Sequence, residues 1–194
     1  AVLNLIDVKE MRHIGHVKRS DLVGLSVSFG ATLALGIETG MVIAIVASML
    51  VVFARMSRPH TAVLGRIPDS TSYRNVERFP EAITTPGIEV VRVDVSLSFV
   101  NAQFIKQICS HAAQRLGDPH RAVVLDCSGI NDIDATGADA LGEIITDLDE
   151  ACVRLHLADV KGPVRDVLRR AGLWERFDRR IHSTPHLAVE EITG

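Results

Sequence analysis

The sequence predicts an α/β domain, a mixed and mostly parallel β-sheet covered by helices, preceded by an α-helical hairpin that crosses a membrane. The first observation is the stretch 22–54, whose 33 residues include one ionisable side chain, Glu38. The second is the alternation of short apolar strands with amphipathic helices after residue 88. The third is charge: residues 1–68 hold seven Lys or Arg and four Asp or Glu, whereas residues 69–194 hold 14 and 20. A basic apolar part followed by an acidic polar part indicates two environments.

The apolar stretch is too uniform and too long for a single helix of a soluble domain. Its part 42–53, VIAIVASMLVVF, has no polar face. One continuous helix would be about 50 Å long, against roughly 30 Å for a hydrocarbon core. Gly36 and Gly40 bracket Glu38, so the pattern predicts a tight turn at 36–40 between two arms, 22–35 and 41–54. A secretory signal does not fit this length, and the remaining chain is too short to bury such a hairpin.

Basic residues on both sides of the hairpin predict its orientation. Because positive flanks face the cytoplasm, both ends are expected there, which requires an even number of crossings. These flanking residues are Lys9, Arg12, Lys18 and Arg19 before the hairpin and Arg55, Arg58 and Arg66 after it. The predicted organisation is a cytoplasmic or interfacial helix at 1–20, a transmembrane hairpin at 21–55, a linker at 56–70 punctuated by Pro and Gly, and the α/β domain at 71–194.

The α/β domain is predicted from periodicity and from capping residues. A short strand includes Tyr73, and alternating valines indicate a strand at 89–95. Asn101 is placed to cap a helix that reaches residue 116, where Gly117 ends it. The later elements, in chain order, are a strand at 122–126, a helix at 137–151, a strand at 154–160, a helix from residue 162, a strand at 180–182 and a helix from residue 184.

The loop after the strand 122–126 is the candidate site. In a parallel sheet such loops gather at one edge, where ligands bind. The following helix begins with unpaired N–H groups and about half a positive charge, which stabilise a phosphate. Thr136 offers a hydroxyl for phosphorylation or phosphate contact, and Gly137 is expected to leave the backbone accessible. Asp132 and Asp134 would oppose a phosphoryl group there, so that it acts as a switch.

An ordinary structural explanation of the same residues stays open. Thr136 then caps the helix, Asp134 stabilises its N-terminus, and Asp126 and Ser128 close the turn. A second loop, 159–165, reaches the same edge. Its cations are Lys161 and Arg165. They attract an anion such as a nucleotide phosphate, or they form the solvated start of a helix.

Neither a catalytic nor a metal site is predicted. The sequence contains no GxxxxGK[ST], GxSxG, CxxC or HExxH motif. Its three cysteines are far apart, which is typical of buried, reduced thiols in an intracellular domain. His156 falls in a strand and is interpreted as a packed or edge residue rather than a base. A net charge of −3 does not indicate nucleic-acid binding. We therefore expect no enzyme activity and no required cofactor.

Four stretches carry a resemblance to a known family: LGIETG at 35–40, SRPHTAVLGRIP at 57–68, VLDCSGINDIDATG at 124–137 and LADVKGPV at 157–164. With the hairpin, they resemble the C-terminal part of a SulP-type (sulfate permease) anion transporter, its last transmembrane helices plus a STAS domain. The resemblance implies secondary active transport of sulfate or a related anion by a multi-pass protein of the cell (inner) membrane. Its STAS domain would be cytoplasmic and regulatory. The implied partners are the remaining transporter helices, the lipid bilayer, an inorganic anion such as sulfate, and a second copy in a homodimer.

The resemblance also suggests roles for the two loops. STAS domains are shared with anti-sigma factor antagonists, in which the hydroxyl residue of this loop is phosphorylated. The nearest position here is Thr136, although Ala135-Thr136-Gly137 replaces the usual Ser-Ser-Gly. The alternative function is therefore an antagonist-like phospho-switch protein, which would have no use for the hairpin. Some STAS domains bind guanine nucleotides, and the candidate residues for this here are Ser128, Asp132, Asp134, Lys161 and Arg165.

Overall fold

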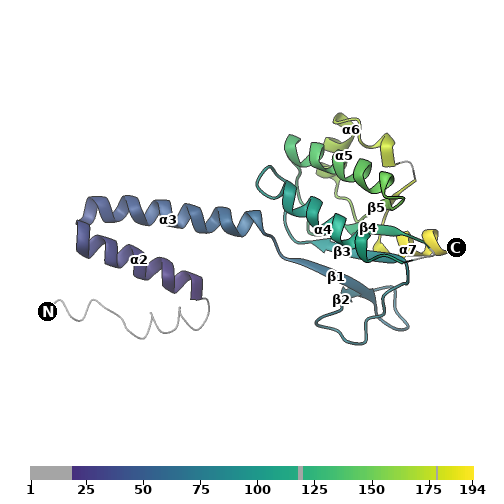
Figure 1. Ribbon diagram of the computed structural model, residues 1–194, viewed down its shortest axis with the longest axis horizontal. Coiled ribbons are helices and arrows are strands. Elements are labelled where there is room, and N and C mark those ends of the chain that lie inside the picture. Colours follow the sequence, from purple (N-terminus) through teal and green to yellow (C-terminus); the bar gives the residue numbers. More distant parts are fainter. Residues whose placement is uncertain (1–18, 118–119, 178) are drawn as a thin grey trace. The chain divides into compact units, whose positions relative to one another are not determined.

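The computed structural model describes residues 19–117, 120–177 and 179–194, and the chain divides into two compact units between Arg55 and Met56 (Figure 1). The helix expected at 1–20 lies outside the described residues except for its last two, which open the first described helix.

The first unit contains a helical hairpin with a shorter turn than predicted. Helix α2 (Arg19–Leu35) and helix α3 (Ile37–Ser57) are separated by Gly36 alone, whose φ is 84°. Glycine adopts this left-handed conformation without a Cβ clash. Residues 37–40 already form the first turn of α3, where the helix dipole favours the carboxylate of Glu38. A Cβ on Gly40 would lie 2.5 Å from the Cα of Thr32, so this glycine lets α3 pack closely against α2.

Among the described residues, α3 is the one helix that is long and apolar enough to cross a membrane, with 21 residues. α2 contributes a shorter apolar segment, Val23–Leu35. The large side chains of both helices are exposed; Leu50, for example, is 64% exposed and Leu33 is 72% exposed. A soluble monomer rarely exposes such a continuous apolar surface, so the hairpin suits a hydrocarbon environment.

The second unit is built on a six-stranded sheet in the order β2-β1-β3-β4-β5-β6. Strands β3 to β6 are parallel, and β1 is antiparallel to both β2 and β3, which confirms the mixed, mostly parallel sheet. The strands are β1 (Thr61–Arg66), β2 (Tyr73–Asn75), β3 (Ile88–Val93), β4 (Ala122–Asp126), β5 (Arg154–Ala158) and β6 (Ile181–His182). The helices are α4 (Ala102–Arg115), α5 (Ala135–Glu150), α6 (Gly162–Arg170), the 3-10 turn Glu175–Phe177 and α7 (Pro185–Thr193).

Strand β1 corrects the prediction of a linker at 56–70. It pairs with β2 on one side and β3 on the other, and its Ala62 and Leu64 are buried. Gly65, interpreted as loop punctuation, instead marks a close approach, because a Cβ there would lie 3.0 Å from the carbonyl carbon of Ala82. The sheet therefore begins ten residues earlier than the α/β domain predicted from residue 71.

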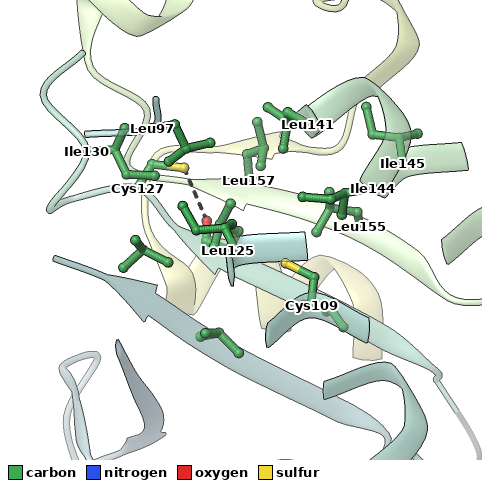
Figure 2. Packing of buried hydrophobic residues seen from close by; sticks show 14 of the residues in the cluster. Leu97, Cys109, Leu125, Cys127, Ile130, Leu141, Ile144, Ile145, Leu155 and Leu157 are labelled. Atoms are coloured by element: carbon green, nitrogen blue, oxygen red, sulfur yellow. Dashed lines mark hydrogen bonds between the residues drawn. The ribbon is translucent and has the colours of Figure 1, made fainter. Parts of the chain in front are cut away.

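The strands alternate their side chains between two apolar clusters, one on each face of the sheet. Figure 2 shows Leu125, Leu155 and Leu157 packed in the larger cluster, which also contains Cys109 of α4 and Ile144 of α5. The smaller cluster on the other face contains side chains of β1, β3, β4 and α7, among them Leu64, Val90, Val124, Ala188 and Val189. Each fully buried Leu or Ile contributes about 1.5–3 kcal/mol to stability.

Two local predictions about side chains are wrong. Asn101 stands at the N-cap position of α4 but makes no side-chain cap. Its amide accepts from Ser98 N at 3.0 Å and donates to Ser96 O at 3.0 Å, so it shapes the preceding loop. Cys109 and Cys127 are buried as predicted, but Cys152 is exposed in the turn after α5. Burial raises the pKa of the Cys109 thiol to about 12, so this thiol stays protonated at neutral pH.

Two buried histidines, His156 of β5 and His182 of β6, form a stacked pair. Nδ1 of His156 lies 2.9 Å from Nε2 of His182, and Nε2 of His156 has no hydrogen-bond partner among the described residues. Burial, followed by repulsion from His182, lowers the pKa of His156 to about 3. Burial also lowers the pKa of His182, and Glu191 opposes this shift. The interpretation of His156 as a packed residue fits this geometry.

We expect the α/β unit to lose stability as the pH falls from 6.5 towards 3. The unfolded chain binds protons at these histidines first, since their folded pKa values lie below 6.5. Each histidine therefore lowers the free energy of unfolding by up to about 1.4 kcal/mol per pH unit. Urea unfolding of the full chain, followed by Trp174 fluorescence, measures this slope. His156→Gln should flatten it and the exposed control His111→Gln should not; an unchanged slope in His156→Gln would contradict the assignment.

Candidate functional site

The carboxyl ends of β3, β4 and β5 meet at one edge of the sheet, as the sequence predicts for parallel strands. The loop after β4 is tied to the loop after β3 by backbone bonds: Leu97 N donates to Asp132 O, and Asp134 N donates to Leu97 O, both at 3.1 Å. Asp132 N also donates to Ser96 Oγ at 3.2 Å. The candidate loop is therefore held firmly before α5 begins.

Asp134, not Thr136, caps α5. Its Oδ1 accepts from Gly137 N at 2.7 Å and its Oδ2 accepts from Phe99 N at 3.0 Å. Thr136 lies in the first turn with an exposed side chain that makes no hydrogen bond within the described part of the chain. A carboxylate already occupies the helix N-terminus, so a phosphoryl group on Thr136 would meet like charge there.

Gly137 does not leave an accessible backbone, which corrects the prediction. It is buried, and a Cβ there would lie 2.9 Å from the carbonyl carbon and oxygen of Leu97. The glycine is required because α5 packs directly on the loop after β3. The predicted turn at the start of the loop is confirmed: Ser128 N donates to Asp126 Oδ1 at 2.9 Å. Burial raises the pKa of Asp126, and its hydrogen bonds from Ser128 oppose this shift.

The second loop meets the first through one polar contact. Lys161 Nζ donates to Asn131 Oδ1 at 2.6 Å, which brings the predicted cation to the edge that carries Ser128, Asp132 and Asp134. Arg165 is directed elsewhere: its Nε donates to Val160 O at 2.8 Å, and its guanidinium lies 5.9 Å from the ring centroid of Trp174. The two predicted cations therefore do not converge.

The same edge continues past β3 to a cluster of polar residues that the sequence did not indicate. Arg92 lies near the end of β3 and Asp94 follows it, His60 precedes β1, and Arg74 lies in β2. No motif links these positions. They come together because β1 lies within the predicted linker and pairs with both β2 and β3. In the described ranges, no group of three His, Cys, Asp or Glu side chains is arranged to hold a metal ion.

Asp134→Ala should lower the free energy of unfolding of the α/β unit by about 1–2 kcal/mol, because it removes the cap of α5. The matched control is Asp132→Ala, since Asp132 is an exposed carboxylate of the same loop whose side chain makes no described hydrogen bond. This control should change stability by less than about 0.5 kcal/mol. Equal losses in the two variants, measured by urea unfolding, would show that Asp134 has no special role.

Residues 79–188 match the family model described as STAS domain. Sulfate transporter 1.1 of Arabidopsis thaliana is 32% identical over 172 residues, which are 84% of this chain and 26% of that protein. A probable sulfate transporter of Mycobacterium tuberculosis is 31% identical over 98% of this chain and 34% of its own length. The chain thus spans about a quarter to a third of the length of these relatives.

A solved structure extends the similarity to both units. The murine Solute Carrier 26 family member A9 anion transporter, in its inward-facing state, matches 96% of this chain and 30% of its own with a TM-score of 0.85 and 20% identity. At this identity the match supports the fold. With the family model and the transporter relatives, it shows that the chain belongs to the STAS family, as the STAS-containing C-terminal part of a SulP-type transporter.

Proposed function

We propose that the full-length protein is a secondary active anion transporter, with sulfate as the expected substrate, and that the unit 56–194 regulates or assembles it. One observation carries this proposal: a helical hairpin with an exposed apolar surface and a STAS domain occupy one continuous chain. The curated relatives named sulfate transporters match across both parts, over 84% and 98% of the chain.

The proposed location is the cell membrane, with the STAS domain on the cytoplasmic side. Arg55 and Arg58 flank the end of α3, and positive residues at the end of a crossing favour the cytoplasmic side. The exposed surfaces of α2 and α3 would then contact lipid and the other transporter helices. Gly24 and Gly30 of α2 support the second contact, because a Cβ at either position would have no neighbour within 4 Å.

The geometry of the two loops favours an interaction surface over a guanine nucleotide site. Lys161 is engaged by Asn131, and Arg165 by Val160 O. Asp134 already uses the N–H of Gly137 that a phosphate would need at the start of α5. The loops therefore present carboxylates and the exposed hydroxyl of Thr136 to a partner.

An antagonist-like phospho-switch is the alternative function, and the exposed Thr136 is the observation that favours it. Membrane fractionation of the full-length protein separates the two functions. We expect the protein to remain in the membrane pellet until detergent is added. A protein that stays soluble without detergent and forms a stable complex with an anti-sigma kinase would overturn the transporter proposal.

A further inference from the structure

A pocket of about 380 Å³ lies at the end of β2 and β3, beyond the two loops described above. Three segments form it: the residue before β1, the end of β2 with the turn that follows, and the end of β3. Its lining residues are His60, Arg74, Asn75, Arg78, Phe79, Arg92 and Asp94. Three guanidinium groups against one carboxylate give the pocket a positive charge.

Asp94 is already paired with two of its neighbours. Its Oδ1 lies 2.6 Å from Arg92 Nε, and its Oδ2 lies 3.0 Å from His60 Nδ1. Burial raises the pKa of Asp94, but the hydrogen bonds from Arg92 and His60 outweigh burial and lower it. Asp94 is therefore a carboxylate that fixes Arg92, and it leaves no negative charge for the other arginines.

Arg74 and Arg78 carry the unmatched charge. Neither side chain makes a hydrogen bond or an ion pair with any residue of the described ranges. The guanidinium of Arg74 lies 5.9 Å from the ring centroid of Phe79, which is 38% exposed. The pocket thus combines two free guanidinium groups with one aromatic face.

Asn75 organises this wall and adds a donor. It is 7% exposed, and its carbonyl oxygen accepts from Arg78 N and Phe79 N, both at 3.0 Å. Its Oδ1 accepts from Glu77 N at 2.8 Å, which fixes the orientation of the amide. Nδ2 is left as a donor without a partner among the described residues. A turn built this way fixes the backbone of Arg78 and Phe79.

We propose that this pocket binds a small organic phosphate, with the monoester dianion held by Arg74, Arg78 and the Asn75 amide. Two free guanidinium groups balance a dianion, and the planar guanidinium matches phosphate oxygens in a bidentate manner. The volume lies within the range of small-molecule sites, roughly 300–1,000 Å³, so an organic group fits beside the phosphate against Phe79. Free metabolites and phosphorylated lipid headgroups both carry such a phosphate group. The lipid headgroup is considered because His60 lies three residues after the end of α3 in the sequence.

The test uses the full chain in phosphatidylcholine nanodiscs, with the side-chain amide signal of Asn75 as the readout. Glycerol 3-phosphate is the soluble probe, and phosphatidylinositol 4-phosphate incorporated in the nanodisc is the lipid probe. A shift with glycerol 3-phosphate identifies a free phosphate, and a shift with the lipid alone identifies a headgroup; either supports the site.

Arg74→Gln with Arg78→Gln should weaken binding at least about tenfold, the loss expected when one charge-assisted hydrogen bond or more is removed. Arg154→Gln with Arg170→Gln removes the same charge elsewhere and should leave binding unchanged. Arg74→Lys with Arg78→Lys keeps the charge but removes the planar guanidinium groups. The affinity of this variant for the phosphate should fall between those of the two glutamine variants. No shift with either probe, full binding by the Arg74→Gln and Arg78→Gln variant, or tighter binding of succinate than of glycerol 3-phosphate would overturn the proposal.

Discussion

Replacing Phe177 by alanine should lower the free energy of unfolding of the α/β unit by about 3–5 kcal/mol, because the lost ring leaves a cavity in the larger core cluster. Phe177 is 0% exposed, the largest of the fully buried side chains. It lies in the 3-10 turn before β6, and its carbonyl oxygen accepts from Arg180 N at 2.8 Å. Losing the ring therefore also loosens the segment that leads into the last strand.

Phe99→Ala is the matched control for Phe177→Ala. Phe99 is 68% exposed, and its hydrogen bond to Asp134 comes from the backbone, which alanine retains. Its loss of stability should stay within about 0.5 kcal/mol. Urea unfolding monitored at Trp174 compares the two variants. If both lose the same amount, the larger cluster is not the main source of stability in this unit.

Gly129→Ala should destabilise the unit by about 1–3 kcal/mol or more, because the new methyl group has no space. A Cβ at this position would lie 2.4 Å from the carbonyl oxygen of Val93 and 2.8 Å from the Cα of Asp94. Both neighbours are backbone atoms at the end of β3, which cannot rotate away as a side chain can. The displacement should reach the phosphate pocket, since Oδ1 of Asp94 would be 3.2 Å from the same Cβ.

Gly162→Ala is the control for this change, because a Cβ there meets nothing within 4 Å. We expect Gly162→Ala to leave both the urea midpoint and the Asn75 amide signal unchanged, and Gly129→Ala to alter both. A Gly129→Ala protein with an unchanged midpoint would show that the loop after β4 is not held against β3 as described.

The regular part of the fold could be predicted from the sequence because its signals are local. Strand β4 is a short continuous apolar run, helix α5 has clear apolar periodicity, and Thr184 and Pro185 mark the start of α7 correctly. Strand β1 could not be predicted in this way. Its segment contains Gly65 and is flanked by Pro59 and Pro68, and its pairing depends on Val90, which lies 26 residues after its partner Leu64. Long-range pairing, rather than local propensity, decides this segment.

In the candidate site, too, a contact from another part of the chain decides what the local sequence leaves open. Asp134 and Thr136 are both suitable caps, and the choice between them depends on Phe99 N, which offers Asp134 a second hydrogen bond from another loop. The pocket around Arg74 and Arg78 depends on the position of β1 as well. Because the sequence does not predict strand β1, it does not indicate that these arginines lie together, although each of them can be read in the sequence.

Uptake of labelled sulfate by liposomes that contain the full-length protein tests the transporter proposal most directly, with unlabelled sulfate, bicarbonate and a dicarboxylate as competitors. We expect saturable uptake that unlabelled sulfate suppresses more strongly than the other two anions. Clear uptake of another anion without uptake of sulfate would contradict the expected substrate. No uptake of any of these anions by protein that is correctly inserted in the bilayer would contradict the proposed function itself.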